Sequence, residues 1–263
     1  MLSAACCVLS EMQRRKDRGK RALSQHDTWT RYRFISRLRE TCQNAASRPN
    51  GNPRSPCLRR ARSTQHLAVL LLVLALAACG EKPPPLPHLG PSDVVLAFGD
   101  SLTYGTGAAT EQAYPNVLSG LIGRTVVGAG VPGETTGEGL QRLPAVLDEV
   151  KPRLLLLCMG GNDMLQKADF PGIESNLREM VKLAKARSID VVLIGVPTPE
   201  LLGGPPAFYE KVAKEFALPL ENKILNDVLF DRSLKSDMIH PNAAGYRRFA
   251  QALAELLHKA GAV

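Results

Sequence analysis

The sequence predicts an α/β protein with helices on both faces of a parallel β-sheet. Along residues 92–263, short runs of consecutive apolar residues alternate with amphipathic segments of helical spacing. Strands that are apolar along their whole length are typical of a parallel sheet buried on both faces. About 170 residues with five such runs suit one doubly wound domain. We therefore expect a single domain with a five-stranded parallel sheet between helices.

The five expected strands are the continuous apolar runs. They lie at 94–98, 125–127, 154–159, 191–196 and, as the weakest of the five, 218–220. In a sheet of this kind, ligands bind beyond the carboxyl ends of the strands. The loops that follow the strands are therefore where a functional site is expected.

Five helices are expected between and after these strands. They lie at 114–121, 137–150, 173–186, 207–216 and 243–258. The last helix places Tyr246, Phe249 and Leu253 on one apolar stripe. The first two end at helix-breaking positions, Gly123 and Pro152.

The positive charge of the chain belongs to its N-terminal third. The whole chain has a formal net charge of +8, but residues 1–79 hold 15 Lys and Arg against 4 Asp and Glu, a net of +11. Residues 80–263 hold 18 against 21, a net of −3. No basic stripe with interleaved aromatic residues occurs in this second part, so the sequence gives no indication of nucleic-acid binding.

Residues 59–78 have the pattern of a secretory signal peptide. A basic stretch precedes an apolar run at 67–78, and these twelve residues are fewer than the roughly 20 that span a bilayer. The sequence LAAC at 76–79 resembles a bacterial lipobox, and the resemblance implies cleavage before Cys79 and lipidation of its thiol. A short buried helix is the alternative interpretation of the apolar run.

The residues that precede this signal do not predict a folded domain. Residues 1–58 are rich in Ser, Arg, Gln and Asn, include four cysteines and show no clear apolar period. Because a signal peptide starts near the N-terminus, our hypothesis is that translation begins near Leu58 at a non-AUG codon. A genuine basic leader is the alternative.

A proline-rich segment separates the lipobox from the folded part. Residues 79–91 comprise the expected lipidated cysteine and a tether, which would rise about 3.1 Å per residue if extended. Residues 92–263 then form the domain. Gly80, rather than an aspartate, follows the cysteine, and the resemblance to bacterial sorting rules implies a lipid-anchored protein on the periplasmic face of the outer membrane.

A serine, a histidine and an aspartate stand where a nucleophilic site would need them. Ser101 directly follows the first expected strand, and a serine hydroxyl becomes a good nucleophile only beside a correctly oriented base. Of the histidines after the signal peptide, His88 lies in the tether and His258 near the end of the last helix, which leaves His240 as the base. Asp237 lies three residues earlier, a spacing at which its carboxylate can accept from the imidazole Nδ1–H.

Acyl transfer also needs donors for the developing oxyanion. The candidates are the backbone N–H groups of Ser101 and Gly133 and the side-chain amide of Asn162, which follow the first, second and third strands. The alternative is that the serine loop binds a phosphate, as in flavodoxin-type domains of the same architecture. The carboxylate of Asp100 beside the supposed phosphate, and Tyr104 in place of a needed glycine, argue against that alternative.

Together these motifs resemble those of the SGNH (GDSL) hydrolase family. The resemblance covers about 93–258, through GDSLTYG at 99–105, VPGETT at 131–136, GGND at 160–163 and DMIHP at 237–241. It implies that Ser101 is the nucleophile, that Gly133 and Asn162 donate to the oxyanion, that Asp237 orients the base and that His240 is the base. Within the family, the chain looks most like the arylesterase branch related to thioesterase I and lysophospholipase.

The resemblance implies an enzyme that hydrolyses carboxylic esters through an acyl-serine intermediate. Aryl or acyl esters, thioesters and lysophospholipids are the substrate classes in view, and neither a metal nor an organic cofactor is expected. One alternative is an O-acetylesterase acting on envelope polysaccharide, and another is a catalytically silent binding lipoprotein. The loop and helix residues expected to form an apolar wall for the substrate are Leu201, Leu202, Phe208 and Tyr209.

Four further residues are expected to have structural roles. Asp100 and Asp163 are interpreted as acceptors of loop N–H groups that hold the turns. Arg142 is interpreted as a charge on a helix surface. Cys158 stands alone after the lipobox, without disulfide partner or metal-ligand spacing, and is interpreted as a small core residue.

Overall fold

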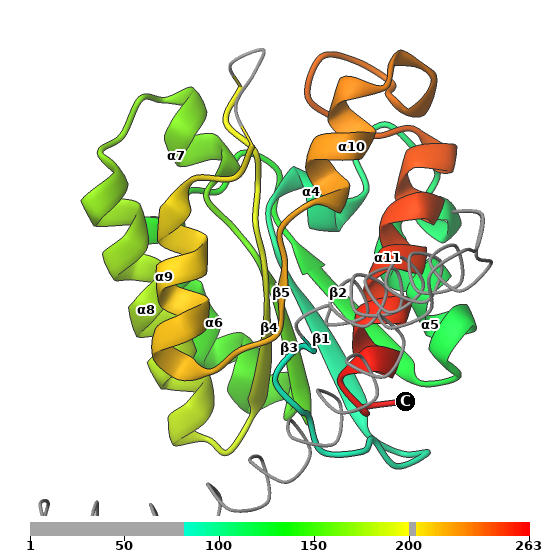
Figure 1. The fold of residues 1–263 in the computed structure, drawn as a ribbon, viewed down its shortest axis with the longest axis vertical. Coiled ribbons are helices and arrows are strands. Elements are labelled where there is room, and N and C mark those ends of the chain that lie inside the picture. Colours follow the sequence, from blue (N-terminus) through cyan, green and yellow to red (C-terminus); the bar gives the residue numbers. More distant parts are fainter. Residues whose placement is uncertain (1–81, 200–203) are drawn as a thin grey trace, which may run out of the picture. The chain divides into compact units, whose positions relative to one another are not determined.

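The computed structural model describes residues 82–199 and 204–263, which form an α/β domain on a five-stranded sheet (Figure 1). The strands are β1 (Val94–Gly99), β2 (Thr125–Gly130), β3 (Leu154–Cys158), β4 (Asp190–Ile194) and β5 (Leu220–Glu221). Their order in the sheet is β2-β1-β3-β4-β5, and every neighbouring pair is parallel. The predicted fold class is confirmed.

Helices cover both faces of the sheet. They are α4 (Ser101–Tyr104), α5 (Tyr114–Ile122), α6 (Thr136–Val150), α7 (Gly161–Leu165), α8 (Phe170–Ala186), α9 (Ala207–Phe216), α10 (Ile224–Phe230) and α11 (Ala243–Lys259), with 3-10 turns η1 (Thr110–Gln112) and η2 (Arg232–Leu234). One face carries α6, α8 and α9, and the other carries α5 and α11 (Figure 1). None of the helices in the described ranges is both long and apolar enough to cross a membrane.

All five predicted helices are present, and three short ones were not predicted. The helices α4, α7 and α10 have four, five and seven residues, too few for an apolar period to be read. Helix α8 also begins three residues before its predicted start. It does so because the Asp169 side chain accepts from the backbone N–H of Gly172 and so caps the helix there.

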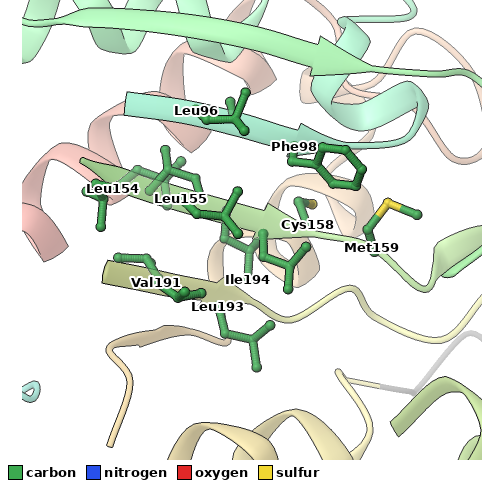
Figure 2. Close-up of a cluster of buried hydrophobic side chains, with 14 of the residues drawn as sticks. Leu96, Phe98, Leu154, Leu155, Cys158, Met159, Val191, Leu193 and Ile194 are labelled. Atoms are coloured by element: carbon green, nitrogen blue, oxygen red, sulfur yellow. The ribbon is translucent and has the colours of Figure 1, made fainter. Parts of the chain in front are cut away.

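The core lies between the sheet and its helices. The four leucines of β3 at 154–157 are at most 1% exposed, as expected for a strand with neighbours on both sides. Figure 2 shows Leu96 and Phe98 of β1 beside them. Cys158 is fully buried in the same cluster, and this burial raises the pKa of its thiol well above the usual value. The interpretation of Cys158 as a core residue is confirmed.

The second half of the predicted proline-rich tether pairs with the C-terminal residues of the domain. The backbone N–H of Leu86 donates to the carbonyl of Ala260, and that of Leu89 donates to the carbonyl of Ala262, each at 2.8 Å. The Leu89 side chain is only 2% exposed. This extended segment pairs with the C-terminal residues, which buries Leu89 and partly buries Leu86. The expected leader, signal peptide and Cys79 lie outside the described residues.

Candidate active site

The candidate nucleophile lies at the turn between the central strand β1 and the short helix α4. A side chain at Gly99, the last residue of β1, would collide with the Cys158 carbonyl and the Thr103 side chain, so the chain can turn here only with glycine. Asp100 then caps α4, because its Oδ1 accepts from the backbone N–H of Leu102 at 2.9 Å. Ser101 is therefore held at the carboxyl edge of the sheet, half-buried.

The structure brings the predicted histidine and aspartate to this serine. His240 Nε2 lies 3.0 Å from Ser101 Oγ, and His240 Nδ1 lies 2.7 Å from Asp237 Oδ2. A carboxylate only accepts hydrogen bonds, so Nδ1 carries the proton and Nε2 is free to accept from the serine hydroxyl. Ser101 is 136 or more positions away from Asp237 and His240 in the chain, and the three side chains meet as a hydrogen-bonded series.

The carboxylate of Asp237 is held in its ionised form. Burial acts to raise the pKa of Asp237, but hydrogen bonds from the His240 imidazole and from two backbone N–H groups outweigh it and lower the pKa below its ordinary value. Those two N–H groups belong to Ile239 and His240 and lie 2.9 Å from Oδ1. The carboxylate can therefore orient the imidazole down to acidic pH.

The loop that carries His240 is closed by short-range bonds. We call residues 231–242 the acid–base loop. The N–H of Ser236 donates to the His240 carbonyl at 3.0 Å, and the N–H of Asn242 donates to the Leu234 carbonyl at 2.8 Å. The Asn242 side chain also caps α11. These bonds explain why the Asp-x-x-His spacing places both side chains correctly.

The predicted oxyanion donors belong to the segments that follow β1, β2 and β3. Gly133 has φ +83°, a left-handed conformation that favours glycine. Among the residues that the structure describes, the backbone N–H groups of Ser101 and Gly133 donate to no acceptor. The Asn162 Nδ2 donates to the Glu134 carbonyl at 2.9 Å and, over a longer 3.3 Å, to Asp100 Oδ2. The structure thus assembles all three groups around one edge.

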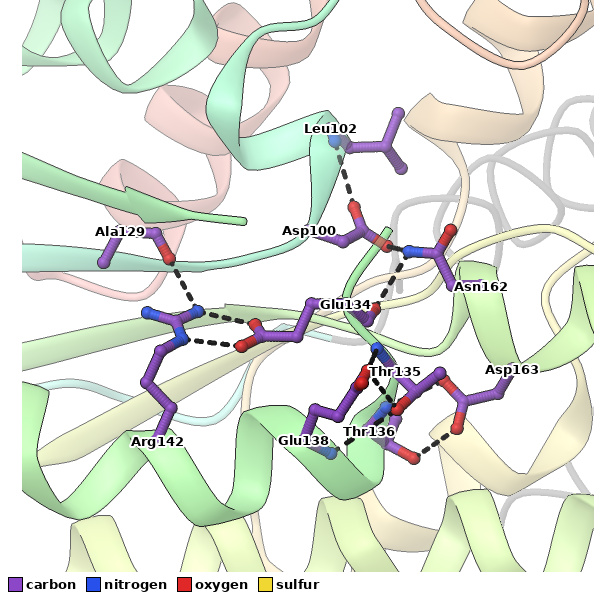
Figure 3. A network of polar contacts seen from close by, with 10 residues as sticks. All are labelled: Asp100, Leu102, Ala129, Glu134, Thr135, Thr136, Glu138, Arg142, Asn162 and Asp163. Carbon is purple, nitrogen blue, oxygen red and sulfur yellow. Dashed lines mark hydrogen bonds and ion pairs between the residues drawn. The ribbon is translucent and has the colours of Figure 1, made fainter. Parts of the chain in front are cut away.

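The polar network beneath these donors is drawn in Figure 3, and it corrects the interpretation of Arg142. Arg142 is not a surface charge: its Nε and Nη2 each lie 2.6 Å from a carboxylate oxygen of Glu134, which is buried. Its Nη2 also donates to the Ala129 carbonyl at 3.1 Å, and its guanidinium stacks 4.1 Å from the Phe98 ring centroid. The pair therefore fixes the loop between β2 and α6.

The two acidic residues beside the motifs do hold turns, as expected. Asp163 accepts from the backbone N–H of Thr136 at 2.8 Å and from its hydroxyl at 2.6 Å, which joins α7 to the start of α6. Asp100 accepts from Leu102 and Asn162. Burial raises the pKa of Asp100 to about 6, even though the Leu102 N–H and the nearby His240 favour its ionised form.

A cleft of about 530 Å³ opens beside Ser101 and His240. Its apolar lining residues are Leu102, Leu165, Val196, Pro197, Pro199, Leu229, Phe230, Met238 and Ile239. The prediction that Phe208 and Tyr209 line it is wrong, because both are buried in the core, where the Tyr209 hydroxyl donates to the Met159 carbonyl at 2.8 Å. The predicted Leu201 and Leu202 lie outside the described residues.

Sequence reasoning missed the true wall of the cleft for two reasons. Leu229 and Phe230 end α10, whose seven residues were not predicted as a helix. Met238 and Ile239 stand between Asp237 and His240, and they are exposed although they are large and apolar. The two apolar residues between the candidate acid and the candidate base in DMIH were the signal that the sequence offered. Within the described ranges, no group of three or more His, Cys, Asp or Glu side chains could hold a metal ion.

Comparison with protein families gives one match over this region. The model of the GDSL-like Lipase/Acylhydrolase family matches residues 97–248, which include every candidate residue described above. This range is more than half of the chain. It begins within β1 and ends within α11.

Curated and solved proteins with similar sequences carry esterase names. Thioesterase 1/protease 1/lysophospholipase L1 of Escherichia coli is 34% identical over 159 residues, which cover 57% of this chain and 76% of that protein. An arylesterase of Vibrio mimicus is 31% identical over 179 residues, 64% of this chain and 90% of that protein. A crystal structure of TesA superposes with a TM-score of 0.58 at 30% identity, over 63% of this chain and 98% of that one.

Proposed function

Because the chain belongs to the GDSL-like lipase/acylhydrolase family, it is a serine hydrolase acting on esters, and we propose that Ser101, His240 and Asp237 carry out the reaction. One observation carries this assignment. The Ser101 hydroxyl, the His240 imidazole and the Asp237 carboxylate form an unbroken hydrogen-bonded series, with separations of 3.0 and 2.7 Å, at the rim of a cleft. That arrangement is what activates a serine for acyl transfer.

The reaction proceeds in two halves. In the first, Ser101 Oγ attacks the ester carbonyl carbon while His240 Nε2 takes the hydroxyl proton, and the ionised Asp237 stabilises the resulting imidazolium. His240 then gives the proton to the leaving alkoxide, which departs and leaves an acyl-serine. In the second half, His240 takes a proton from water, the hydroxide attacks the acyl carbon, and Ser101 leaves with the proton returned by His240.

The oxyanion is bound by the two free N–H groups and the Asn162 amide. Ser101 N–H and Gly133 N–H need no rearrangement, since neither donates within the described domain. The Asn162 amide already makes two bonds, and the longer one, at 3.3 Å to Asp100, is the weaker and the easier to exchange for an oxyanion. The bond to the Glu134 carbonyl would be kept and would hold the amide in place.

Covalent labelling tests the nucleophile. We expect a fluorophosphonate probe to label the wild-type protein and peptide mapping to place the adduct on Ser101. Ser101→Ala should abolish both labelling and ester hydrolysis while the thermal unfolding curve stays close to that of the wild type. Ser175→Ala, which changes an exposed serine of α8 outside the cleft lining, is the matched control and should still be labelled. Labelling of Ser101→Ala would overturn the assignment.

The cleft favours acyl or aryl groups larger than acetyl. Its volume of about 530 Å³ and its mainly apolar lining fit a chain of several carbons, and an acetyl group would leave most of that surface uncovered. We expect kcat/KM to rise with acyl length from acetyl to a medium chain, across both oxygen esters and thioesters. A profile that peaks at acetyl would instead support the polysaccharide O-acetylesterase.

We also propose that the chain is a lipoprotein of the bacterial cell envelope. The support is the LAAC sequence at 76–79 after an apolar run, together with the active domain that follows it. Cys79 would carry the lipid, and more than one acyl chain gives firm membrane attachment. Expression with a labelled fatty acid should label the wild-type protein, and Cys79→Ser should remove the label. A label that persists in Cys79→Ser would contradict the proposal.

A further inference from the structure

Two cationic side chains line the substrate cleft. Arg232 of η2 and Lys235 both line the cleft. Within residues 82–199 and 204–263, neither forms an ion pair. Some arginines of the domain do form ion pairs, among them Arg142 with Glu134 and Arg187 with Asp148.

The acidic groups near the cleft are each engaged by their own loops. Asp100 is buried and accepts from Leu102 and Asn162. Asp237 accepts from His240 and from two backbone N–H groups. Asp231, next to Arg232, accepts from the N–H and hydroxyl of Ser233. None of the three forms an ion pair with Arg232 or Lys235 within the described residues, so both cationic groups are free to contact a ligand.

Lys235 is held next to the catalytic histidine. An antiparallel bridge joins Lys235 to Pro241, and its Nζ lies 3.4 Å from the carbonyl of Met238. The backbone of Lys235 is therefore fixed within the acid–base loop, because it is paired with the residue that follows His240. A substrate bound to Ser101 and lying against Met238 passes close to this ammonium group.

We propose that Arg232 and Lys235 bind an anionic group of the substrate, so that the preferred esters are amphiphiles that join an apolar chain to a phosphate or carboxylate. This inference rests on the proposed esterase function of the same cleft. The apolar wall accounts for the chain, and the two cations account for the anion. Two cationic side chains that line the cleft and form no ion pair within the described residues can attract and position an anionic ligand.

The anion can lie on either side of the scissile bond, and matched pairs of esters distinguish the two. For the alcohol side, the pair is 1-octanoylglycerol and 1-octanoylglycerol 3-phosphate, both kept as monomers. For the acyl side, the pair is 4-nitrophenyl hexanoate and the 4-nitrophenyl monoester of adipic acid. Within each pair the reacting ester is the same kind, so the ratio of kcat/KM for the anionic over the neutral member reports the subsite.

The test compares these ratios in the wild type and in the double variant Arg232→Gln/Lys235→Gln. Exposed charge contacts contribute modestly, so we expect the ratio to fall about 3- to 20-fold for at least one pair. Added NaCl should lower the wild-type ratio and leave that of the variant almost unchanged. The variant Arg232→Lys/Lys235→Arg, which keeps both charges, should retain most of the preference.

A second double variant, Lys185→Gln/Lys214→Gln, is the control for overall charge. It removes the same two charges from the last turns of α8 and α9, which lie outside the cleft lining. Its ratios should equal those of the wild type. The inference is overturned if the cleft variant keeps both wild-type ratios while the neutral esters are hydrolysed. If the wild-type protein hydrolyses no member of either pair, the proposed function itself fails.

Discussion

The oxyanion side of the site and its acid–base loop are held in place by different kinds of contact. On the oxyanion side, the bonds join residues far apart in the chain: Asn162 to Asp100 across 62 positions, Asn162 to Glu134 across 28, and Thr136 to Asp163 across 27. In the acid–base loop, Asp237 and His240 are three positions apart. One side depends on the packed fold, and the other is built almost entirely by its own loop.

The two carboxylates that flank the site differ in the same way. Burial raises the pKa of Asp100 to about 6, whereas the Asp237 side chain is 53% exposed and its hydrogen bonds lower its pKa. The buried Asp100 accepts hydrogen bonds from Leu102 and Asn162, but its burial makes the carboxyl group harder to ionise. An exposed acid that accepts three hydrogen bonds stays ionised and can orient the base. The difference suggests how to disturb each side separately.

The largest expected effect comes from the oxyanion side. Asn162→Ala should lower kcat by about 10²- to 10³-fold, the loss usual for one oxyanion donor, with a smaller change in KM. Asn176→Ala is the matched control, because its amide donates to Thr136 in the same network but does not line the cleft. Steady-state kinetics on a soluble ester measures both. A comparable loss in Asn176→Ala would show that the network, and not the donor, matters.

The next effect concerns the pH dependence of stability. The folded-state pKa of Asp100 is about 6, above its unfolded value of 3.8, so between these values the folded protein binds more protons than the unfolded chain. The free energy of unfolding should therefore fall as pH rises from about 4 to about 6, by an amount on the order of 2–3 kcal/mol.

Urea unfolding at several pH values measures this slope. Asp100→Asn should flatten it, whereas the loss of a hydrogen bond would only shift the whole curve by a constant amount. Asp237→Asn is the counterpart from the other side of the site. Because its folded-state pKa is lowered, its contribution is present above the unfolded pKa and lost at more acidic pH, so it should leave the slope between 4 and 6 unchanged. Equal slopes in Asp100→Asn and the wild type would contradict the assignment.

The smallest expected effect follows from the ion pair under the oxyanion loop. Arg142→Ala leaves the mostly buried Glu134 without its partner and loosens the loop that carries Gly133, so kcat should fall about 10-fold and stability by about 2 kcal/mol. Arg142→Lys should restore part of kcat. Arg153→Ala, which breaks a similar pair with Asp190 at 2.9 Å, should reduce stability alone. A drop in stability with unchanged kcat in Arg142→Ala would reduce the pair to a structural role.

Local and long-range features differed in how well the sequence predicted them. Asp237 and His240 could be predicted because their pairing depends on a spacing of only three residues. Ser101 could be predicted because it lies just after a clearly apolar strand. The partner of Arg142 could not be predicted, since the pairing with Glu134 depends on how the loop folds back over Phe98. The apolar wall of the cleft was not predicted because Phe230 ends a helix that is too short to show a helical period of apolar residues.

The pairing of Leu86 and Leu89 with the C-terminal residues holds both ends of the described domain close together. Both ends of the described domain lie at the edge of the sheet where β1 begins (Figure 1). The cleft is lined by residues such as Ser101, which lie at the edge where β1 ends. The ends of the described domain and the cleft therefore lie at opposite edges of the sheet. A tag or linker at the C-terminus therefore leaves the domain at the edge opposite the cleft, so immobilisation through the C-terminus should leave the cleft accessible to substrate.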